Sequence, residues 1–274
     1  MLRHKVRTSS PLENRICFLT IPHPPYYNYT IKQRGTATYF LIDAVIIFNK
    51  NIFMPRVARI VVPKYPHHIT HRGNYKQIVF EDKDDFILYA KLMAKYSKKY
   101  GLIFLSYALM PNHVHFIAIP ENRDSLAKIF NITQMVYAQY SNEKRAVSGH
   151  LWGDRFYSCI LDPAHLYRAI RYVERNAFRA GLVKKPWDWE WSSAQEHAGG
   201  KKSLIPLANI SEFVEISNWK DYLCEEDDNK YIEELRKHTK SGRPAGEKDF
   251  TEKIELVLNR KILPQKRGRP LKNR

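Results

Sequence analysis

Two apolar runs joined by a Pro-Asn turn constrain the fold of this 274-residue chain more than any other feature. Leu102–Met110 is apolar almost throughout, which is typical of a buried strand, and His113–Ile119 follows as a second strand that ends at Pro120. Pro111 and Asn112 between the runs favour a tight turn. The pattern therefore predicts a β-hairpin buried in the core.

The elements around the hairpin alternate between strands and helices. They are predicted, in chain order, as a strand at Pro66–Arg72, a helix at Asp84–Tyr100 closed by Gly101, the hairpin, a helix at Ser125–Tyr140, a strand at Trp152–Leu161, and a helix from the cap Asp162-Pro163 to Ala180. The first six elements follow the split βαβ order. This order predicts an α+β, ferredoxin-like fold, an antiparallel sheet with helices on one face, followed by a small helical C-terminal region.

Composition divides the chain into three segments. Residues 1–53 show no sustained period and are predicted to be a poorly structured extension, whereas residues 54–200 carry all the strong periodic signals. Residues 201–274 are predicted to be a helical, basic, DNA-binding region, although they include an acidic patch at Glu225–Asp228. The net charge of +17 favours a polyanionic partner, most commonly nucleic acid. A basic but otherwise ordinary soluble enzyme is the alternative.

Several classes of protein are excluded by cysteine usage and hydropathy. Cys17, Cys159 and Cys224 are an odd number without motif spacing, which argues against a disulfide-stapled domain and a four-cysteine zinc site. The longest apolar run, Tyr39–Phe48, is about half the ~20 residues that cross a bilayer and is interrupted by Asp43. We therefore expect no membrane association and a cytoplasmic, nucleoid-associated protein.

The second strand of the hairpin carries a His-x-His pair. Side chains two residues apart on a strand point to the same face, so His113 and His115 project together. Two adjacent imidazoles are a candidate bidentate metal site, and an ordinary polar face is the alternative.

The last predicted helix carries a tyrosine in a positively charged setting. Its buried stripe is formed by Leu166, Ile170, Val173 and Ala177. Tyr172 and Asn176 lie together off this stripe, and their neighbours are Arg168, Arg175 and Arg179. Arginines stabilise both a phenolate and the phosphate that it attacks, so Tyr172 is a candidate nucleophile. The alternative is an exposed tyrosine that packs on a neighbouring element.

Other clusters have two interpretations each. The histidines of the first strand, His67, His68 and His71, could contribute to a zinc site or belong to a scaffold and DNA-facing strand that ends at Arg72. The tryptophans Trp187, Trp189 and Trp191 could stack on unpaired bases or pack in the core. Two Gly-Arg-Pro triplets contain Arg243 and Arg269. The second, with Arg267, resembles an AT-hook that enters a narrow minor groove, or is a disordered basic tail.

Six motifs in one order resemble the REP-associated tyrosine transposases, which belong to the single-tyrosine HUH transposases of the insertion-sequence-two-hundred type. They are Met54-Pro-Arg-Val-Ala-Arg, Pro66-His-His-Ile-Thr-His-Arg-Gly-Asn74, Met110-Pro-Asn-His-Val-His115, Leu151-Trp-Gly-Asp-Arg-Phe156, the stretch from Tyr172 to Val183, and Trp191-Ser-Ser193. The resemblance covers residues 54–200 and implies an HUH nuclease fold that acts on single-stranded DNA. Two departures are Asn176-Ala177 where the family has Asn-Pro, and the 53-residue extension, which a misassigned start codon would explain.

The resemblance also implies the roles of individual residues. His113 and His115 would be metal ligands with Asn176 as the third, and Tyr172 would be the nucleophile; Tyr157 and Tyr167 are rivals. The implied cofactor is a divalent ion, Mg²⁺ or Mn²⁺, and the implied partners are single-stranded hairpins of repeat palindromes. Both a monomer and a homodimer occur in the family. Two further hypotheses are a non-catalytic DNA-binding protein that keeps the fold, and a metal hydrolase unrelated to DNA.

Overall fold

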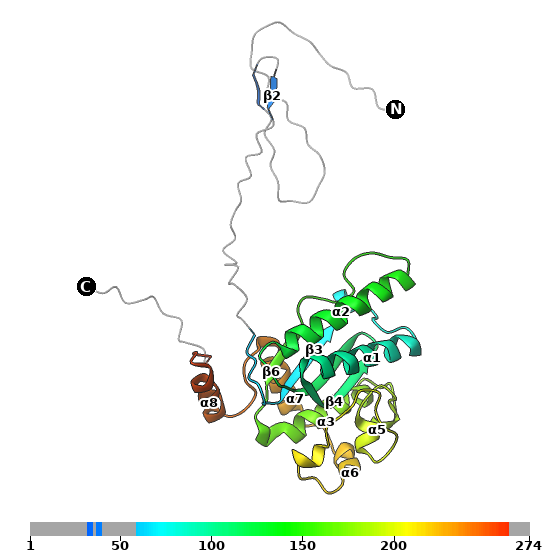
Figure 1. Cartoon of the computed structure of the whole chain (residues 1–274), viewed down its shortest axis with the longest axis vertical. Helices are drawn as coiled ribbons and strands as arrows, with labels where there is room; N and C mark the ends of the chain where they lie inside the picture. Colours follow the sequence, from blue (N-terminus) through cyan, green and yellow to red (C-terminus); the bar gives the residue numbers. More distant parts are fainter. Residues whose placement is uncertain (1–31, 35–36, 40–58, 263–274) are drawn as a thin grey trace, which may run out of the picture. The chain divides into compact units, whose positions relative to one another are not determined.

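The computed structural model describes residues 32–34, 37–39 and 59–262 of the chain (Figure 1). The chain divides into two units, residues 1–57 and residues 58–274. Every strand and helix predicted from the sequence falls in the second unit.

The first unit contains one pair of short strands. β1 (Lys32–Arg34) and β2 (Ala37–Tyr39) pair in antiparallel register. The sequence analysis predicts a poorly structured extension for residues 1–53, so this pair of strands differs from that prediction. Thr38 and Tyr39 are residues that favour strands, which accounts for the difference.

A four-stranded antiparallel sheet forms the centre of the second unit. Its strands, in the order in which they lie side by side, are β4 (Leu102–Met110), β5 (His113–Pro120), β3 (His67–Arg72) and β6 (Tyr157–Ile160). The hairpin is therefore β4 and β5, and β5 lies at an interior position of the sheet. With the intervening helices, this arrangement confirms the predicted α+β, ferredoxin-like fold.

The last strand is shorter than predicted. It spans Tyr157–Ile160 rather than Trp152–Leu161, because Gly153 and Asp154 are turn-favouring residues that interrupt the strand. Trp152 instead forms an isolated antiparallel bridge with Gly73 and is buried in the core.

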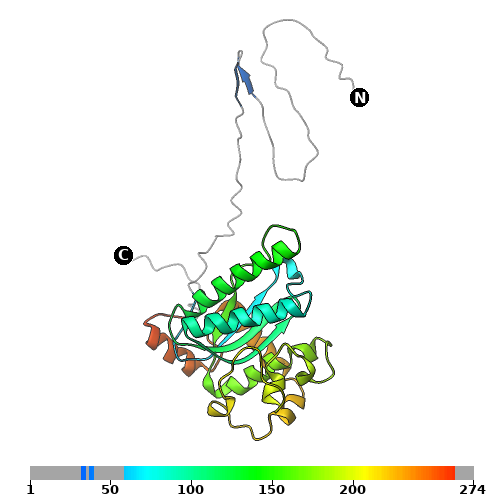
Figure 2. The ribbon, with the colours of Figure 1, turned by 45° about the vertical axis from the view of Figure 1, so that its right-hand side comes forward.

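Two long helices cover one face of the sheet. α1 (Lys83–Tyr100) and α2 (Ser125–Lys144) pack against each other, and the two views show them side by side (Figures 1 and 2). The carboxylate of Asp82 accepts a hydrogen bond from the backbone N–H of Asp85 and caps α1. Gly101 closes α1 in the left-handed conformation, as the sequence predicts.

The opposite face of the sheet is also covered, whereas the sequence predicts helices on one face only. Alternate residues of β5 belong to different apolar clusters: Val114 and Phe116 pack toward α1 and α2, and Ile117 packs toward the helices after residue 163. A strand that is apolar on both faces needs a covering layer on each. His113 and His115 share their face with Ile117, since they lie two and four residues from it.

The tyrosine-bearing segment is broken in the middle. Asp162 caps the short helix η2 (Pro163–His165), and α3 (Leu166–Glu174) and α4 (Asn176–Arg179) follow with a break at Arg175. The sequence predicts one continuous helix here. The side-chain amide of Asn176 donates to two carbonyls of the preceding turn, and this competes with the regular backbone ladder.

The remaining helices are short or lie in the C-terminal region. They are η1 (Asn74–Lys76), η3 (Pro186–Asp188), α5 (Ala194–His197), η4 (Ile210–Glu212), α6 (Trp219–Cys224), α7 (Asn229–Ser241) and α8 (Lys248–Leu258). α7 packs on β6 and β3, so residues after 200 complete the layer over the second face. In the part of the chain that the structure describes, no helix is both long and apolar enough to cross a membrane.

Two glycines with positive φ allow the cost of a steric clash to be distinguished from the cost of backbone strain. Gly101 and Gly181 have φ of +70° and +71°, but a Cβ on Gly101 would lie 3.0 Å from Glu121 Cβ, whereas a Cβ on Gly181 would meet nothing within 4 Å. We expect Gly181→Ala to lower the free energy of unfolding by about 1 kcal/mol and Gly101→Ala to lower it by about 2 kcal/mol, as measured by urea denaturation. Equal losses would show that Glu121 moves aside without cost.

Candidate active site

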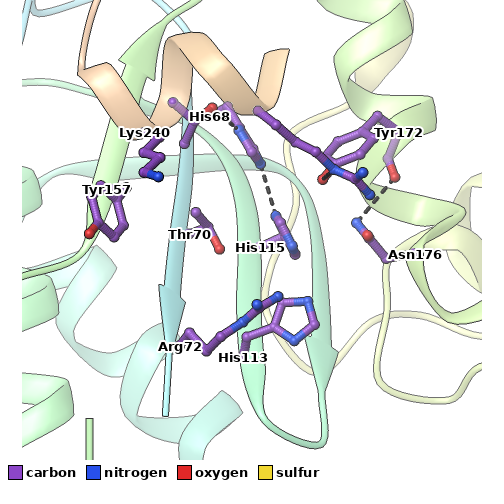
Figure 3. Close-up of a pocket in the computed structure, with 11 residues that line it drawn as sticks. His68, Thr70, Arg72, His113, His115, Tyr157, Tyr172, Asn176 and Lys240 are labelled. Atoms are coloured by element: carbon purple, nitrogen blue, oxygen red, sulfur yellow. Dashed lines mark hydrogen bonds between the residues drawn. The ribbon is translucent and has the colours of Figure 1, made fainter. Parts of the chain in front are cut away.

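Six elements of the second unit line a cavity of about 560 Å³ on the second face of the sheet. Its lining residues are His68, Thr70 and Arg72 of β3, His113 and His115 of β5, Tyr157 of β6, Tyr172 of α3, Asn176 of α4, and Arg236, Thr239 and Lys240 of α7. Figure 3 shows the imidazoles, Tyr172 and Asn176 facing one space from separate elements. The structure therefore brings together the predicted metal ligands, the predicted nucleophile and Arg72.

The proton of His113 is located by its neighbour. Asn112 Nδ2 donates to the carbonyl of Lys76, which leaves Asn112 Oδ1 facing His113 Nδ1 at 2.6 Å. An amide oxygen only accepts, so Nδ1 of His113 carries the proton. In the neutral ring, Nε2 of His113 is then the nitrogen with a free lone pair.

A chain of hydrogen bonds locates the proton of His115 in the same way. Thr239 Oγ1 donates its one proton to the carbonyl of Leu235 at 2.7 Å, so it must accept from His68 Nδ1, also at 2.7 Å. His68 Nε2 is then an acceptor, and His115 Nδ1 donates to it at 2.9 Å. Nε2 of His115 is again the nitrogen with the lone pair.

Burial keeps these imidazoles neutral. Burial and the positive charges of Arg72 and Arg236 lower the pKa of His113 to about 4. Burial lowers the pKa of His68 to about 3. Burial also holds the pKa of His115 well below its usual range, and the positive charges of Arg72 and Arg179 act in the same direction. Neutral imidazole is the form that binds metal ions, and a second ring nitrogen held by a hydrogen bond is the usual support of such a ligand.

The donor set fits a divalent cation. Among the described residues, no cluster of three or more His, Cys, Asp or Glu side chains could hold a metal ion, so a third protein ligand has to be of another type. Asn176 lines the same cavity and carries an amide oxygen. In this structure that oxygen accepts a hydrogen bond from Arg179 at 3.3 Å. Two imidazole nitrogens and an amide oxygen suit a divalent ion.

The other histidines of β3 do not form a zinc site. His67 Nδ1 donates to the carbonyl of Tyr65, and His71 Nε2 donates to the carbonyl of Asp154, so each has its own backbone partner. All three histidines of β3 are buried, and His68 is the one that lines the cavity. The strand therefore acts as a scaffold, with His68 as a support for His115.

Tyr172 is buried against the histidines, with 4% of its surface exposed. Its ring meets the rings of His68 and His115 edge to face, with centroids 5.6 and 5.7 Å apart. Its hydroxyl oxygen accepts a hydrogen bond from Arg236 Nε at 3.3 Å. Tyr172 is therefore not exposed, in contrast to the alternative interpretation, although its ring does pack on neighbouring elements. Of the rivals, Tyr157 lines the cavity, whereas Tyr167 packs on Tyr222.

The predicted arginines of α3 and α4 contact the acidic segment Glu225–Asp228. Arg175 and Arg179 both bind the carboxylate of Asp227, at 3.0 and 2.9 Å, and Arg168 pairs with Asp228. Arg171 is not among the arginines predicted from the sequence. It is buried and donates hydrogen bonds to backbone carbonyls of the same region. In this structure the arginine cluster therefore holds the acidic segment against the tyrosine helix.

The remaining predicted DNA contacts lie elsewhere. Arg243 is exposed between α7 and α8, and Arg267 and Arg269 lie outside the described residues. Trp191 is a core residue that stacks on Phe86 with centroids 4.7 Å apart, so core packing is correct for this tryptophan.

Three lining residues of α7 are not predicted by the sequence. Arg236, Thr239 and Lys240 have the i, i+3, i+4 spacing that places them on one helix face. That spacing is visible in the sequence, but nothing there indicates that this face lies over β3 and β6.

A buried carboxylate fixes the end of the tyrosine helix. Glu174, the last residue of α3, accepts hydrogen bonds from Ser193 Oγ and His197 Nδ1 on one oxygen and from Trp219 Nε1 on the other. Its side chain is fully buried. Burial lowers the pKa of His197, but the charge and hydrogen bond of Glu174 outweigh this, so the pKa is raised.

Comparison with known proteins gives one family match. Residues 61–176 match the model of the family described as transposase IS200 like. Among solved structures, the chain is similar to a REP-associated tyrosine transposase bound to a REP hairpin, with 16% identity, a TM-score of 0.43, and coverage of 60% of this chain and 96% of the other. A protein assigned as a transposase from Deinococcus radiodurans R1 is 16% identical, with a TM-score of 0.32, over 43% of this chain and 95% of the other. A search of curated proteins finds no match.

The raised pKa of His197 predicts a pH-dependent contribution to stability. A group with a folded pKa above its ordinary value of 6.5 stabilises the fold fully below that value, and its contribution is lost as the pH rises through the folded pKa. We expect the difference in unfolding free energy between the wild type and His197→Gln to be larger at pH 6 than at pH 9, by about 1–2 kcal/mol. Urea denaturation at the two pH values measures it, and a difference that grows with pH would contradict the assignment.

Proposed function

We propose that this protein, whose residues 61–176 match the model of the family described as transposase IS200 like, is a metal-dependent tyrosine transposase that cleaves and rejoins single-stranded DNA. The observation that carries the proposal is the position of Tyr172 beside His115, in the cavity that His113 and Asn176 also line. A nucleophile and two neutral imidazoles next to cationic side chains are the parts that phosphoryl transfer to tyrosine needs.

Each part has a chemical role in the proposed reaction. A divalent ion, Mg²⁺ or Mn²⁺, held by His113, His115 and Asn176, would polarise the scissile phosphate when bound. Arg72 and Lys240 supply positive charge at the cavity and attract the phosphodiester.

The tyrosine performs a transesterification. The bond from the Tyr172 oxygen to phosphorus forms while the bond from phosphorus to O3′ breaks, and the leaving oxygen gains a proton. The products are a 5′-phosphotyrosine and a free 3′-hydroxyl. Attack by the 3′-hydroxyl of a second strand reverses the step, and no ATP is needed because the phosphotyrosine keeps the bond energy.

The proposed substrate is a single-stranded hairpin of a repeat palindrome, on the basis of the sequence motifs. Arg243, Arg267 and Arg269 are proposed to hold the hairpin. Arg168, Arg175 and Arg179 would reach DNA only after the acidic segment Glu225–Asp228 moved away. The proposed location is the nucleoid in the cytoplasm, where such DNA occurs.

We propose that Tyr172 acts in its own subunit. Its ring contacts His68 and His115 of the same chain, so a monomer contains the whole constellation. A homodimer that exchanges the tyrosine helix would separate these rings, and the mass of the particle that forms the adduct distinguishes the two.

The nucleophile can be tested with the full chain and a labelled single-stranded hairpin in Mn²⁺. We expect a covalent protein–DNA adduct on a denaturing gel, lost with a chelator and reduced by about 10³-fold or more in Tyr172→Phe, because a missing nucleophile leaves nothing to bond with phosphorus. Tyr157→Phe is the matched control: this tyrosine lines the same cavity, and we expect it to retain the adduct.

Two results would contradict the proposal. An adduct that survives in Tyr172→Phe would identify another nucleophile. No adduct over a panel of hairpins, together with tight and salt-sensitive binding, would support the alternative of a non-catalytic DNA-binding protein.

A further inference from the structure

We infer that Arg236, on helix α7, is a catalytic residue: its guanidinium binds the oxygen of Tyr172 and stabilises the negative charge that passes through this oxygen to the phosphate. The inference rests on the proposed function and adds a residue from the C-terminal region to the reacting centre. It concerns a side chain outside the matched family region, residues 61–176.

The contact is made at the reacting atom. Arg236 Nε donates to the hydroxyl oxygen of Tyr172 at 3.3 Å, and its guanidinium carbon lies 5.8 Å from the centre of the ring. Arg236 also lines the cavity into which His113 and His115 project. The guanidinium therefore contacts the nucleophilic oxygen and lines the same cavity that is proposed to receive the phosphate.

Arg236 differs from the arginines of the tyrosine helix because its guanidinium is available to bind a phosphate. Arg168, Arg175 and Arg179 form ion pairs with Asp227 or Asp228. Within residues 59–262, no ion pair to a carboxylate is found for Arg236. Its two terminal nitrogens can therefore bind phosphate oxygens while Nε stays on the tyrosine oxygen, since a guanidinium has five donors in a fixed plane.

The helix that carries Arg236 is held in place by its neighbours. Leu235 and Thr239 are buried at 1% and 2% exposure, and Thr239 is bonded to His68 on β3. Gly242 ends the helix in the left-handed conformation. Arg236 thus projects from a rigid support, which is what a preorganised catalytic donor requires.

The proposed step conserves atoms and charge. The tyrosine O–H bond breaks, the O–P bond forms, and the P–O3′ bond breaks, with a net transfer of one proton from the phenol to O3′. Arg236 keeps all its protons and only donates hydrogen bonds. A lysine at this position would supply charge but not the planar set of donors.

The test compares Arg236→Ala and Arg236→Lys with Lys237→Ala, an exposed neighbour on the same helix that does not line the cavity. Single-turnover rates of adduct formation are measured with the full chain, a single-stranded hairpin and Mn²⁺. We expect Arg236→Ala to be about 10²-fold slower, Arg236→Lys to recover part of the rate, and Lys237→Ala to match the wild type.

Two further measurements separate catalysis from folding and affinity. Added guanidinium chloride at millimolar concentration should accelerate Arg236→Ala but not the wild type. The Kd for the hairpin is measured in Tyr172→Phe with and without the Arg236→Ala substitution. We expect the fold-change in this Kd to be smaller than the fold-change in the rate of adduct formation that Arg236→Ala causes in the wild type, which places most of the loss in the chemical step.

The outcomes are distinct. A wild-type rate in Arg236→Ala, or a loss fully explained by weaker hairpin binding, overturns the inference and leaves the proposed function intact. A wild type that forms no adduct with any hairpin overturns the proposed function and this inference with it.

Discussion

The site depends on one chain of hydrogen bonds that crosses three elements. It runs from the carbonyl of Leu235 through Thr239 and His68 to His115, and it joins residues 171 and 47 positions apart in the sequence. Because each link has a defined donor, the direction of the whole chain is fixed by the hydroxyl of Thr239. The same contacts that seat α7 on the sheet therefore leave the outer nitrogen of His115 unprotonated beside Tyr172.

The arginines near the site fall into two groups: those that form ion pairs within the protein, and one that contacts the oxygen of Tyr172. The net charge of +17 favours a polyanionic partner. The arginines nearest Tyr172 in the sequence nevertheless bind the acidic segment Glu225–Asp228 and secure the C-terminal region to the tyrosine helix. The guanidinium that reaches the tyrosine oxygen comes from α7 instead. Ion pairs hold the scaffold, and an arginine without a carboxylate partner among the described residues faces the cavity.

Local sequence signals predict most of the fold and the core of the site. The hairpin, the caps at Asp162 and Gly101, and the shared face of His113 and His115 follow from short-range rules that this chain obeys. The break at Arg175 and the roles of Arg236 and Thr239 do not, because they depend on contacts between distant segments. The helical spacing predicts which residues share one face of α7, but it does not predict that this face packs on β3 and β6.

The direction of the hydrogen-bond chain can be measured without DNA or metal. Long-range nitrogen–proton NMR correlations of the imidazole rings, assigned by their loss in His113→Gln and His115→Gln, report which nitrogen carries the proton. We expect both rings to be neutral with the proton on Nδ1 and a bare Nε2. A proton on Nε2 of His115 would reverse the chain, remove its lone pair from the cavity and contradict this account of the site.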